Sequence, residues 1–208
     1  MKYMEKELVD ILKKIRAILI DKGVKHINLD SVSEILGISK DQLNKYFRDD
    51  HDLVSQILEF ERQGFKVIFD EYDFEGVNAI DIMLTVSKEL ANKYDYISPA
   101  YSTEIEKYYP DIYQEHFNSR RDFVFDKIQI NLRKGISQGL YRSDLSIELI
   151  SRLYMSRLMD IHNTDYFPAE KFSFETLFEI MFDSLIRSIA TEEGMEYYTK
   201  KNKELKFK

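Results

Sequence analysis

Hydrophobic residues recur at helical spacing along most of this 208-residue sequence. The clearest short pattern lies between residues 28 and 47. Its first apolar positions follow the i, i+3, i+6, i+7 spacing of one helix face: Leu29, Val32, Ile35 and Leu36. Asn28 is a suitable N-cap for that helix. Gly37 follows its last turn, where a residue that tolerates left-handed backbone angles is needed, so the pattern predicts a short helix ending in a tight turn.

A second short helix is predicted after the turn, whose corner is filled by Ile38. Ser39 can cap its start, and Leu43 and Phe47 face inward at i, i+4. The side chains left facing outward are Lys40, Gln42, Asn44, Lys45 and Tyr46. A tight helix pair with polar groups outward on its second member is typical of a helix-turn-helix, whose second helix enters the DNA major groove. A two-helix corner of an ordinary all-α protein is the alternative.

Longer amphipathic helices are predicted on both sides of this pair. One covers residues 5–22 and ends at Gly23, with a single buried face made by Leu8, Ile11, Leu12, Ile15, Ile18 and Leu19. Another begins near Asp49 or Asp50, where acidic side chains suit the positive end of the helix dipole, and continues to about Asp70. We expect the first three helices to form a head that reads DNA, and the fourth to join this head to the body.

The remaining sequence predicts a helical body. A break over residues 70–76 is followed by a helix over residues 77–93 and, further on, by a long helix over residues 111–138. Pro99 and Pro110 lie between these two helices, at positions that suit the first turn of a helix.

Two further helices are apolar on most of their sides. The first is capped by Ser143 or Asp144 and ends about Asn163, and the second covers residues 173–190. Since such helices must be covered on most sides, we expect a second copy of the chain to complete a two-fold four-helix interface. The alternative is that both helices are central within a monomer. The tail, residues 191–208, has no sustained apolar face, and its Lys-rich end is expected to be solvated or frayed.

Composition narrows the class of protein. Apolar residues make up 44% of the chain, which is enough for a large core, and only 7 Gly and 3 Pro occur. Few turn-forming residues, with abundant Glu, Lys, Leu and Ile, favour an all-α fold. The absence of Cys excludes disulfides and thiolate metal sites and is compatible with a reducing cytoplasm. Neither a signal peptide nor an apolar run of about 18 residues is present, so we expect a cytoplasmic protein that does not span a membrane.

The formal net charge of −7 is unusual for a DNA-binding protein, so its distribution matters. Residues 1–55 contain 10 basic and 10 acidic residues, whereas residues 56–208 contain 20 and 27. The predicted head is therefore neutral and lacks the broad basic surface that DNA-binding domains usually carry. A local basic patch, which a two-fold dimer would double, can still arise from Lys25, Lys40, Lys45 and Arg48.

The first 55 residues or so resemble the tetracycline-repressor (TetR) family of one-component bacterial transcription regulators. The matching positions are Ile15, Ala17, Leu19 and Gly23, then Asn28 to Ile35, then Gly37, Ile38 and Ser39, and finally Leu43, Phe47 and Leu53. The chain length and the all-helical remainder also fit this family. Three positions depart from its pattern: Ser33 replaces a small Ala, Asn44 replaces an aromatic residue, and Asp50 replaces a Lys that meets a DNA phosphate.

The resemblance implies an all-α fold with an N-terminal three-helix helix-turn-helix DNA-binding domain, residues 1–50, and a C-terminal helical ligand-binding and dimerisation domain, residues 51–208. It also implies a homodimeric repressor that binds a double-stranded DNA operator and is released or modulated by a small apolar or aromatic effector. No cofactor is expected. The alternative is a dimeric helical module for ligand or protein binding with weak or lost DNA binding, which the neutral head and Asp50 favour.

The candidate DNA-binding residues lie in and around the helix-turn-helix. They are Lys25, Asn28, Ser39, Lys40, Gln42, Asn44, Lys45, Tyr46, Arg48 and His51. Asn and Gln can pair bidentately with adenine, and Lys can reach guanine or phosphate. The Lys, Gln and Asn residues between positions 40 and 45 are expected to approach base edges, whereas Tyr46 and His51 would contact the DNA backbone. The alternative is that they are only exposed polar residues of a helix.

An aromatic region between residues 94 and 125 indicates an effector site, because ligand pockets are mostly apolar with a few polar groups and Tyr supplies both. We expect a cavity between the helices of residues 77–138, lined by some of Tyr94, Tyr101, Tyr108, Phe117 and Phe123. Ordinary packing of bulky residues in a core or a dimer interface is the alternative.

Catalysis is not expected. The sequence contains no HExxH motif, phosphate-binding glycine loop or nucleophile elbow, and its four His residues are far apart. His116 with Glu115 and Asp111 makes only a weak metal pattern, because no second His follows at helical spacing.

Overall fold

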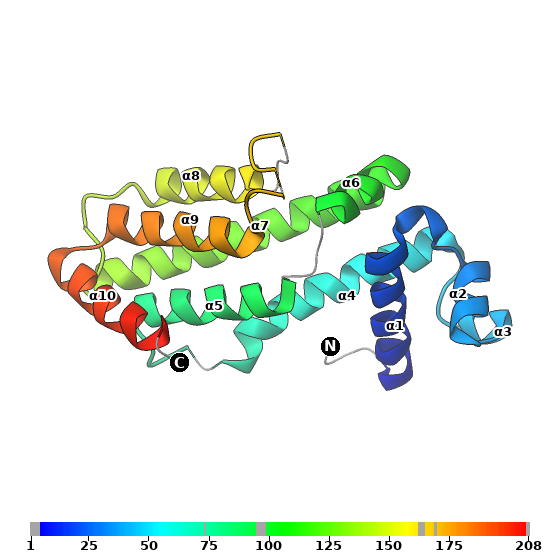
Figure 1. The fold of residues 1–208 in the computed structure, drawn as a ribbon. Coiled ribbons are helices and arrows are strands. Elements are labelled where there is room, and N and C mark those ends of the chain that lie inside the picture. The colour runs from blue at the N-terminus through cyan, green and yellow to red at the C-terminus, as the bar shows by residue number, and fades with distance from the viewer. Residues whose placement is uncertain (1–4, 73, 95–98, 162–164, 169, 207–208) are drawn as a thin grey trace. The chain divides into compact units, whose positions relative to one another are not determined.

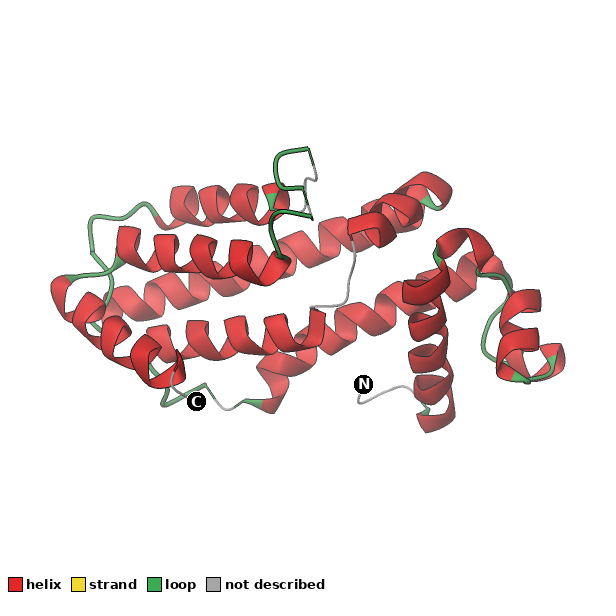
Figure 2. Cartoon of the chain, in the orientation of Figure 1, coloured by secondary structure: helices red, strands yellow, loops and turns green. Residues whose placement is uncertain are grey.

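The computed structural model describes residues 5–72, 74–94, 99–161, 165–168 and 170–206. These residues form ten α-helices and one 3-10 helix joined by loops, and they contain no strand (Figure 1; Figure 2). The predicted all-α fold is therefore confirmed. The helices are α1 (Lys6–Lys22), η1 (Val24–His26), α2 (Leu29–Leu36), α3 (Lys40–Leu43), α4 (Asp50–Glu71), α5 (Ala79–Tyr94), α6 (Pro99–Tyr108), α7 (Pro110–Ser137), α8 (Ile147–Asp160), α9 (Phe174–Ile189) and α10 (Glu192–Lys206). Within the described residues, none of these helices has both the length and the apolar composition that a membrane span requires.

The chain divides into two units, and each has its own hydrophobic core. The first unit holds α1 to α4, α6 and the part of α7 that ends at Arg120. The second unit holds α5, the part of α7 that begins at Arg121, and α8 to α10. This division follows packing, whereas the boundary expected after residue 50 separates functions and stays a prediction.

The core of the first unit is built around the head. Helix α1 contributes the apolar face expected from its sequence, with Leu12 and Ile15 fully buried. Two residues from much later in the chain enter the same core, because Ile105 of α6 and Ile112 of α7 are only 1% and 6% exposed. The α6–α7 corner, residues 105–113, therefore shares one core with the head.

The core of the second unit joins α7, α8 and α9, and α8 runs alongside α9 in Figure 1. A group of hydrogen bonds fixes the first residue of α5, Ala79, on this core. The buried Asn131 donates its amide to the Ala79 carbonyl at 2.9 Å and accepts the Tyr141 hydroxyl at 3.2 Å. Gln138 accepts the Ala79 N–H at 2.9 Å. Both backbone groups at the start of α5 are thereby paired.

Most helix boundaries agree with the sequence pattern. Pro99 and Pro110 are the first residues of α6 and α7, where proline is tolerated because the first N–H of a helix has no partner within it. Gly23 follows α1 with a φ of +81°, and its N–H reaches the Leu19 carbonyl. Gly23 therefore ends α1 as predicted.

The expected N-cap of α8 at Ser143 or Asp144 is wrong. The N-cap is Ser146, two or three residues later, and the helix begins at Ile147. The N–H of Arg142 donates to the Ile189 carbonyl at 2.9 Å, so the chain before α8 is held against the end of α9 instead of coiling. This contact joins distant parts of the sequence, which a local pattern does not reveal.

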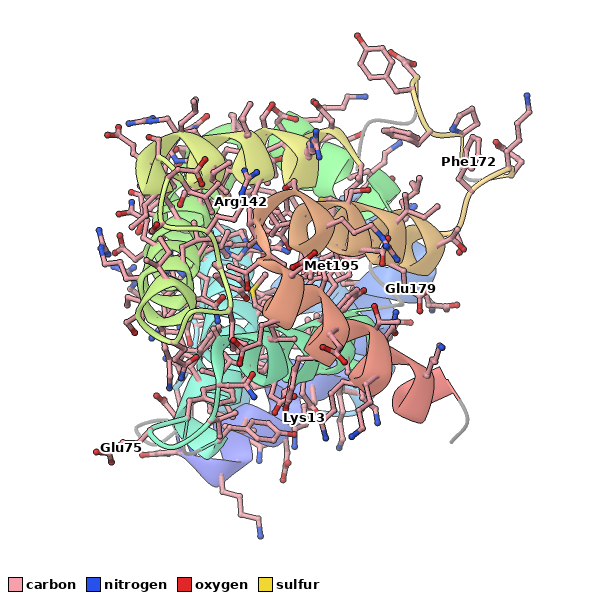
Figure 3. All side chains as sticks on the ribbon, turned by 90° about the vertical axis from the view of Figure 1, so that its left-hand side faces the viewer. Lys13, Glu75, Arg142, Phe172, Glu179 and Met195 are labelled. Atoms are coloured by element: carbon pink, nitrogen blue, oxygen red, sulfur yellow. The ribbon has the colours of Figure 1, made fainter. Side chains whose placement is uncertain are left out.

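The tail forms a helix docked on the core of the second unit, which the sequence did not predict, and Lys200 and Lys203 of its Lys-rich end are exposed. Tyr198 of α10 is 2% exposed, and its hydroxyl donates to Asp183 at 3.0 Å. Met195, labelled in Figure 3, packs against the same core. Tyr197 packs there too, and these three side chains with the buried Gly194 are too few to produce a sustained apolar pattern in the sequence. They suffice because the second unit supplies a facing surface.

Replacing Gly194 by Ala should weaken the docking of α10. A Cβ atom there would lie 2.1 Å from the carbonyl oxygen of Leu140, a backbone atom that cannot rotate away. Ala favours a helix by about 1 kcal/mol over Gly, but we expect the clash to dominate. The free energy of unfolding, measured by urea denaturation, should fall by about 1–3 kcal/mol. Gly76→Ala is the matched control, because a Cβ there meets no atom within 4 Å, and it should cause no loss. Equal stability of the two variants would contradict the docking of α10.

Candidate functional site

The turn between α2 and α3 is held by local hydrogen bonds. Asn28 caps α2, because its Oδ1 accepts the Ser31 N–H at 2.8 Å while the Ser31 hydroxyl accepts the Asn28 N–H at 3.1 Å. Such reciprocal bonds satisfy donors that a helix start leaves unpaired. Gly37 adopts a φ of +64°, as its predicted role requires, and its N–H reaches the Ser33 carbonyl. The Ser33 hydroxyl also donates to the Ile38 carbonyl at 2.7 Å, which gives a structural role to the serine that departs from the TetR pattern.

Helix α3 is short, and a second reciprocal cap fixes its start. Ser39 accepts the Gln42 N–H at 3.3 Å, and the Gln42 side chain accepts the Ser39 N–H at 3.3 Å. Beyond Leu43 the chain continues to Phe47 as hydrogen-bonded turns, so the helical part is shorter than predicted. Leu43 and Phe47 are nevertheless fully buried, as their spacing predicted.

Three of the ten predicted DNA-binding side chains are exposed and make no hydrogen bond or ion pair with any described residue. They are Lys25, Asn44 and Lys45. Lys25 lies in η1, and the other two directly follow α3. The face beside α3 therefore offers one amide and one ammonium group, with a second ammonium group on η1, to a phosphate or a base edge.

Three more already have acidic partners at the surface. The pairs are Lys40 with Asp30 (2.5 Å), Arg48 with Asp52 (3.3 Å) and His51 with Asp111 (2.8 Å). The hydrogen bond to His51 holds the pKa of Asp111 below its usual range. Exposed pairs of this kind contribute only about 0–1 kcal/mol, so a DNA phosphate can compete for the basic partner.

The last four predicted contacts are constrained by the head itself. Three belong to the helix caps: Asn28, Ser39 and Gln42. Gln42 would have to leave its capping bond to pair with adenine. Tyr46 was expected to face outward, but it is half-buried against the core of the first unit. A hydrogen bond with Glu7 raises the pKa of the Tyr46 hydroxyl, and Gln56 donates to the Tyr46 carbonyl at 2.7 Å.

Two carboxylates hold the head in ways that the sequence does not reveal. Asp50 accepts the N–H of Leu29, the first residue of α2, at 2.8 Å. Glu104 of α6 accepts the Val24 N–H at 2.7 Å and lies so close to Gly23 that a Cβ there would be 2.7 Å from its Oε2. These bonds join residues 21 and 80 positions apart in the chain. No local spacing could have pointed to them.

The five aromatic residues predicted to line an effector cavity fall in both units. Tyr108 is exposed, whereas Phe117 and Phe123 are half-buried. Tyr108 and Phe117 belong to the first unit and Phe123 to the second. The side chains of Tyr94 and Tyr101 lie outside the described residues. A cavity lined by these residues stays a prediction.

An open groove of about 590 Å³ lies beside α10 in the second unit. The described residues that line it are Met195, Glu196, Thr199, Lys200 and Lys203. Tyr108, Phe117 and Phe123 are not among them, so this groove does not correspond to the predicted aromatic cavity.

A polar cluster in the first unit joins α4 to α7 at His116. The Nδ1 atom of its imidazole ring is shielded from solvent and has no hydrogen-bond partner among the described residues. Burial, followed by the guanidinium groups of Arg120 and Arg62, lowers the pKa of His116 to about 4. The ring is therefore neutral at physiological pH.

The α4 side of this cluster is organised by Glu59. Arg62 donates its Nε to Glu59 at 2.8 Å, and Gln63 donates its Nε2 to the other carboxylate oxygen at 3.0 Å. The Oε1 atom of Gln63 is buried and, like Nδ1 of His116, has no partner in the described part of the chain. No group of three or more His, Asp or Glu side chains in that part is arranged to hold a metal ion.

The stability of the fold should depend on pH through His116. Its pKa is about 4 in the folded chain, against an ordinary value of 6.5. The unfolded chain binds the proton more readily, so the neutral His116 ring contributes to the free energy of unfolding. This contribution is fully present above pH 6.5 and is lost as the pH falls toward 4, by about 3 kcal/mol in total. Urea unfolding of wild type and His116→Gln at pH of about 7 and about 4.5 measures it, since the variant lacks the titrating group.

The difference in free energy of unfolding between wild type and His116→Gln should be smaller at pH of about 4.5 than at pH of about 7. His26→Gln is the control, because the ring of His26 is exposed, and it should follow wild type at both pH values. A difference between wild type and His116→Gln that is the same at both pH values would show that His116 is not held neutral by the fold.

Comparisons with known proteins identify the fold. No protein-family model and no curated protein sequence matches the chain. A putative transcriptional regulator from Saccharomonospora viridis, solved in complex with choline, matches with a TM-score of 0.69 at 14% identity, over 90% of this chain and 100% of that chain. A TetR-family regulator from Agrobacterium tumefaciens matches at 0.67 and 15% identity, over 88% and 96%.

The fatty acid degradation regulator FadR from Bacillus halodurans also matches, at a TM-score of 0.67 and 12% identity, over 88% of this chain and 96% of that chain. At these identities the likeness is one of fold. The chain has the all-α fold of TetR-family transcriptional regulators, with a helix-turn-helix head followed by a helical body.

Proposed function

We propose that this chain is a dimeric DNA-binding transcription regulator, a repressor that a small molecule releases from its operator. The observation that carries the proposal is the helix-turn-helix, in which two reciprocally capped helices meet at a left-handed glycine and bury Leu43 and Phe47. The shared fold with transcriptional regulators supports it. Such a protein works on DNA in the cytoplasm, and the proposal assigns it no reaction.

The DNA-contacting face is formed by the exposed groups beside α3. Asn44 can pair with adenine in the major groove, and Lys45 can reach guanine or phosphate. Lys25 would contact the DNA backbone. Lys40 and Arg48 join them by exchanging their surface carboxylates for phosphates. The head is neutral overall, so these few local cations must supply the electrostatic part of binding.

Dimerisation through α8 and α9 would place two heads on one operator. Large apolar side chains on these helices are more than half exposed in the single chain: Leu149 and Leu153 on α8 and Ile180 on α9. Leu149 and Leu153 are four residues apart, so they lie on one face of the helix. A second copy would cover this face and form a four-helix interface. Two-fold pairing matches the two half-sites of a palindromic operator.

Effector binding would alter the conformation of the head through the α6–α7 corner. Ile105 and Ile112 are buried in the core of the head, and Glu104 holds the N–H that begins η1. A displacement of α6 or α7 therefore changes contacts within the head. A ligand can act in this way only by binding one arrangement more tightly than the other.

A helical ligand-binding or protein-interaction module without DNA binding is the second candidate. The observation that favours it is Asp50, the exposed first residue of α4, whose carboxylate accepts the N–H that begins α2 and would repel a nearby phosphate. The neutral charge of the head points the same way. Absence of a salt-sensitive mobility shift at micromolar protein, with DNA from upstream of its own gene, would favour this candidate.

Substitutions beside α3 should affect DNA binding in two distinct ways. Fluorescence anisotropy with the upstream DNA should show that Lys45→Ala lowers affinity on all sequences and reduces the slope of log K against log salt by about 1 per subunit. Asn44→Ala should cost about 1–3 kcal/mol and relax the preference at one base pair. Lys88→Ala, which removes an exposed lysine of α5, is the control and should leave both quantities unchanged. Wild-type affinity in both Lys45→Ala and Asn44→Ala would show that the face beside α3 does not contact the DNA.

Leu153→Glu should convert a dimer into a monomer. Burying an unpaired carboxylate from each subunit in the interface should weaken association by at least about 3 kcal/mol. Size-exclusion chromatography with light scattering measures the change in mass. Ile130→Glu is the control, because Ile130 is an equally exposed apolar residue on α7, and it should remain dimeric. A wild-type protein that is monomeric at micromolar concentration would contradict the proposed interface.

A further inference from the structure

One of the predicted DNA contacts, His51, is held by a residue from outside the helix-turn-helix. Its Nε2 atom lies 2.8 Å from Oδ2 of Asp111, the second residue of α7, which is 60 positions away in the sequence. The other two ion pairs at predicted DNA contacts stay within residues 30–52. In the described part of the chain, His51 is therefore the predicted DNA contact whose ion pair reaches the α6–α7 corner.

The corner also contacts the face of this imidazole ring through Tyr109. The two rings meet edge to face, with their centroids 6.2 Å apart and their planes at 65°. Tyr109 is half-buried and packs against the core of the first unit. The surroundings of His51 are thus set by two neighbouring residues of the corner, Tyr109 and Asp111.

The bond to Asp111 occupies the N–H of the His51 ring. This hydrogen bond holds the pKa of the Asp111 carboxyl below its usual range, so the carboxylate is ionised near neutral pH and can only accept. Nε2 of His51 must then carry the proton. Nδ1 makes no hydrogen bond with any described residue, and in the neutral ring it has a lone pair, which cannot bond a phosphate oxygen. The N–H that Asp111 accepts is therefore the one that a DNA phosphate needs.

The pair is open to DNA, because the His51 and Asp111 side chains are 55% and 67% exposed. Exposed ion pairs are weak, so a phosphate can replace the carboxylate as the acceptor. While Asp111 remains beside the ring, its negative charge also repels an approaching phosphate. Asp111 therefore opposes DNA binding both by holding the donor and by its charge.

We propose that Asp111 determines DNA affinity from outside the helix-turn-helix, by competing with a DNA phosphate for the Nε2–H of His51. In the free chain the ring donates to Asp111, and on DNA it donates to the phosphate. DNA binding and the position of the α6–α7 corner are then coupled in both directions. An effector that keeps Asp111 on His51 lowers the affinity for DNA. The inference rests on the proposed function, because it takes the head to bind DNA.

Fluorescence anisotropy with the full chain and a duplex from upstream of its own gene measures the competition. Asp111→Asn keeps the size of the side chain and removes its charge, and it should bind about 2- to 5-fold more tightly per subunit, or about 4- to 25-fold in a dimer. A duplex of random sequence should show the same ratio, because a phosphate contact carries no sequence information.

Glu115→Gln is the matched control. Glu115 is exposed one turn further along α7 and makes no hydrogen bond or ion pair with any described residue. The variant removes the same charge, and it should change the affinity by less than about 2-fold, since exposed charges are screened by salt. An equal gain in Glu115→Gln and Asp111→Asn would show a general effect of net charge and overturn the inference.

A second background tests whether Asp111 acts through His51. His51→Phe keeps a ring against Tyr109 and loses the donor, so adding Asp111→Asn to it should leave the affinity unchanged. A gain that persists in the double variant would show that Asp111 acts without His51. Weaker DNA binding by Asp111→Asn alone would show that Asp111 orients the ring for DNA instead of competing with it. Each result would overturn the inference.

NMR spectra of the free chain test the ion pair without DNA. The ¹⁵N resonance of His51 Nε2 should shift in Asp111→Asn and stay in place in Glu115→Gln. An unmoved resonance in Asp111→Asn would show that the bond is not formed in solution. The failure of the proposed function is distinguishable, because DNA binding would then be absent from wild type and every variant. Wild-type DNA binding that Asp111→Asn leaves unchanged would overturn this inference alone.

Discussion

The structure depends on the burial of Leu43 and Phe47 in the core of the first unit. Helix α3 has only four residues, and a helix of that length does not form by itself in water because nucleation is unfavourable. Its shape comes from these two buried side chains and from the reciprocal cap between Ser39 and Gln42. The exposed Asn44 and Lys45 keep their positions only while that core is intact. The proposed DNA-contacting face therefore depends on the core, and contacts made anywhere in the core can alter it.

In the proposed function, the same core would let a neutral head bind a polyanion and be regulated. Its basic side chains at Lys40 and Arg48 are held by surface carboxylates, which are weak partners that phosphates can replace. In the proposed function, DNA binding would exchange these carboxylates for phosphates with a small net gain in free energy. Small changes in the position of α3 would then alter the affinity for DNA. Ile105 and Ile112 place the α6–α7 corner in the same hydrophobic core as the head, so a movement of the corner would shift α3.

The sequence predicted what depends on local spacing. Helix ends marked by Gly23, Gly37 and the two prolines, the caps at Asn28 and Ser39, and the buried stripe of α1 all follow from neighbours within one or two turns. It did not predict contacts between distant segments, which include Asp50 with Leu29, Glu104 with Val24, the start of α8 and the docking of α10. For the candidate site, the pattern identified outward positions on α3 but could not show that Gln42 serves a cap or that Tyr46 is half-buried.

The Glu104–Val24 bond also limits how such a chain can be recombined. Splicing the first 50 residues onto the body of another regulator would separate Glu104 from its backbone partner and leave Ile105 and Ile112 without their apolar neighbours. A stable chimera would have to include the α6–α7 corner together with the head. Otherwise the contacting surfaces of the head and the corner would both have to be redesigned. Gly23 itself is fixed first by its backbone, because its φ of +81° is one that residues with a Cβ rarely adopt, and a Cβ there would also displace the Glu104 carboxylate from its backbone partner.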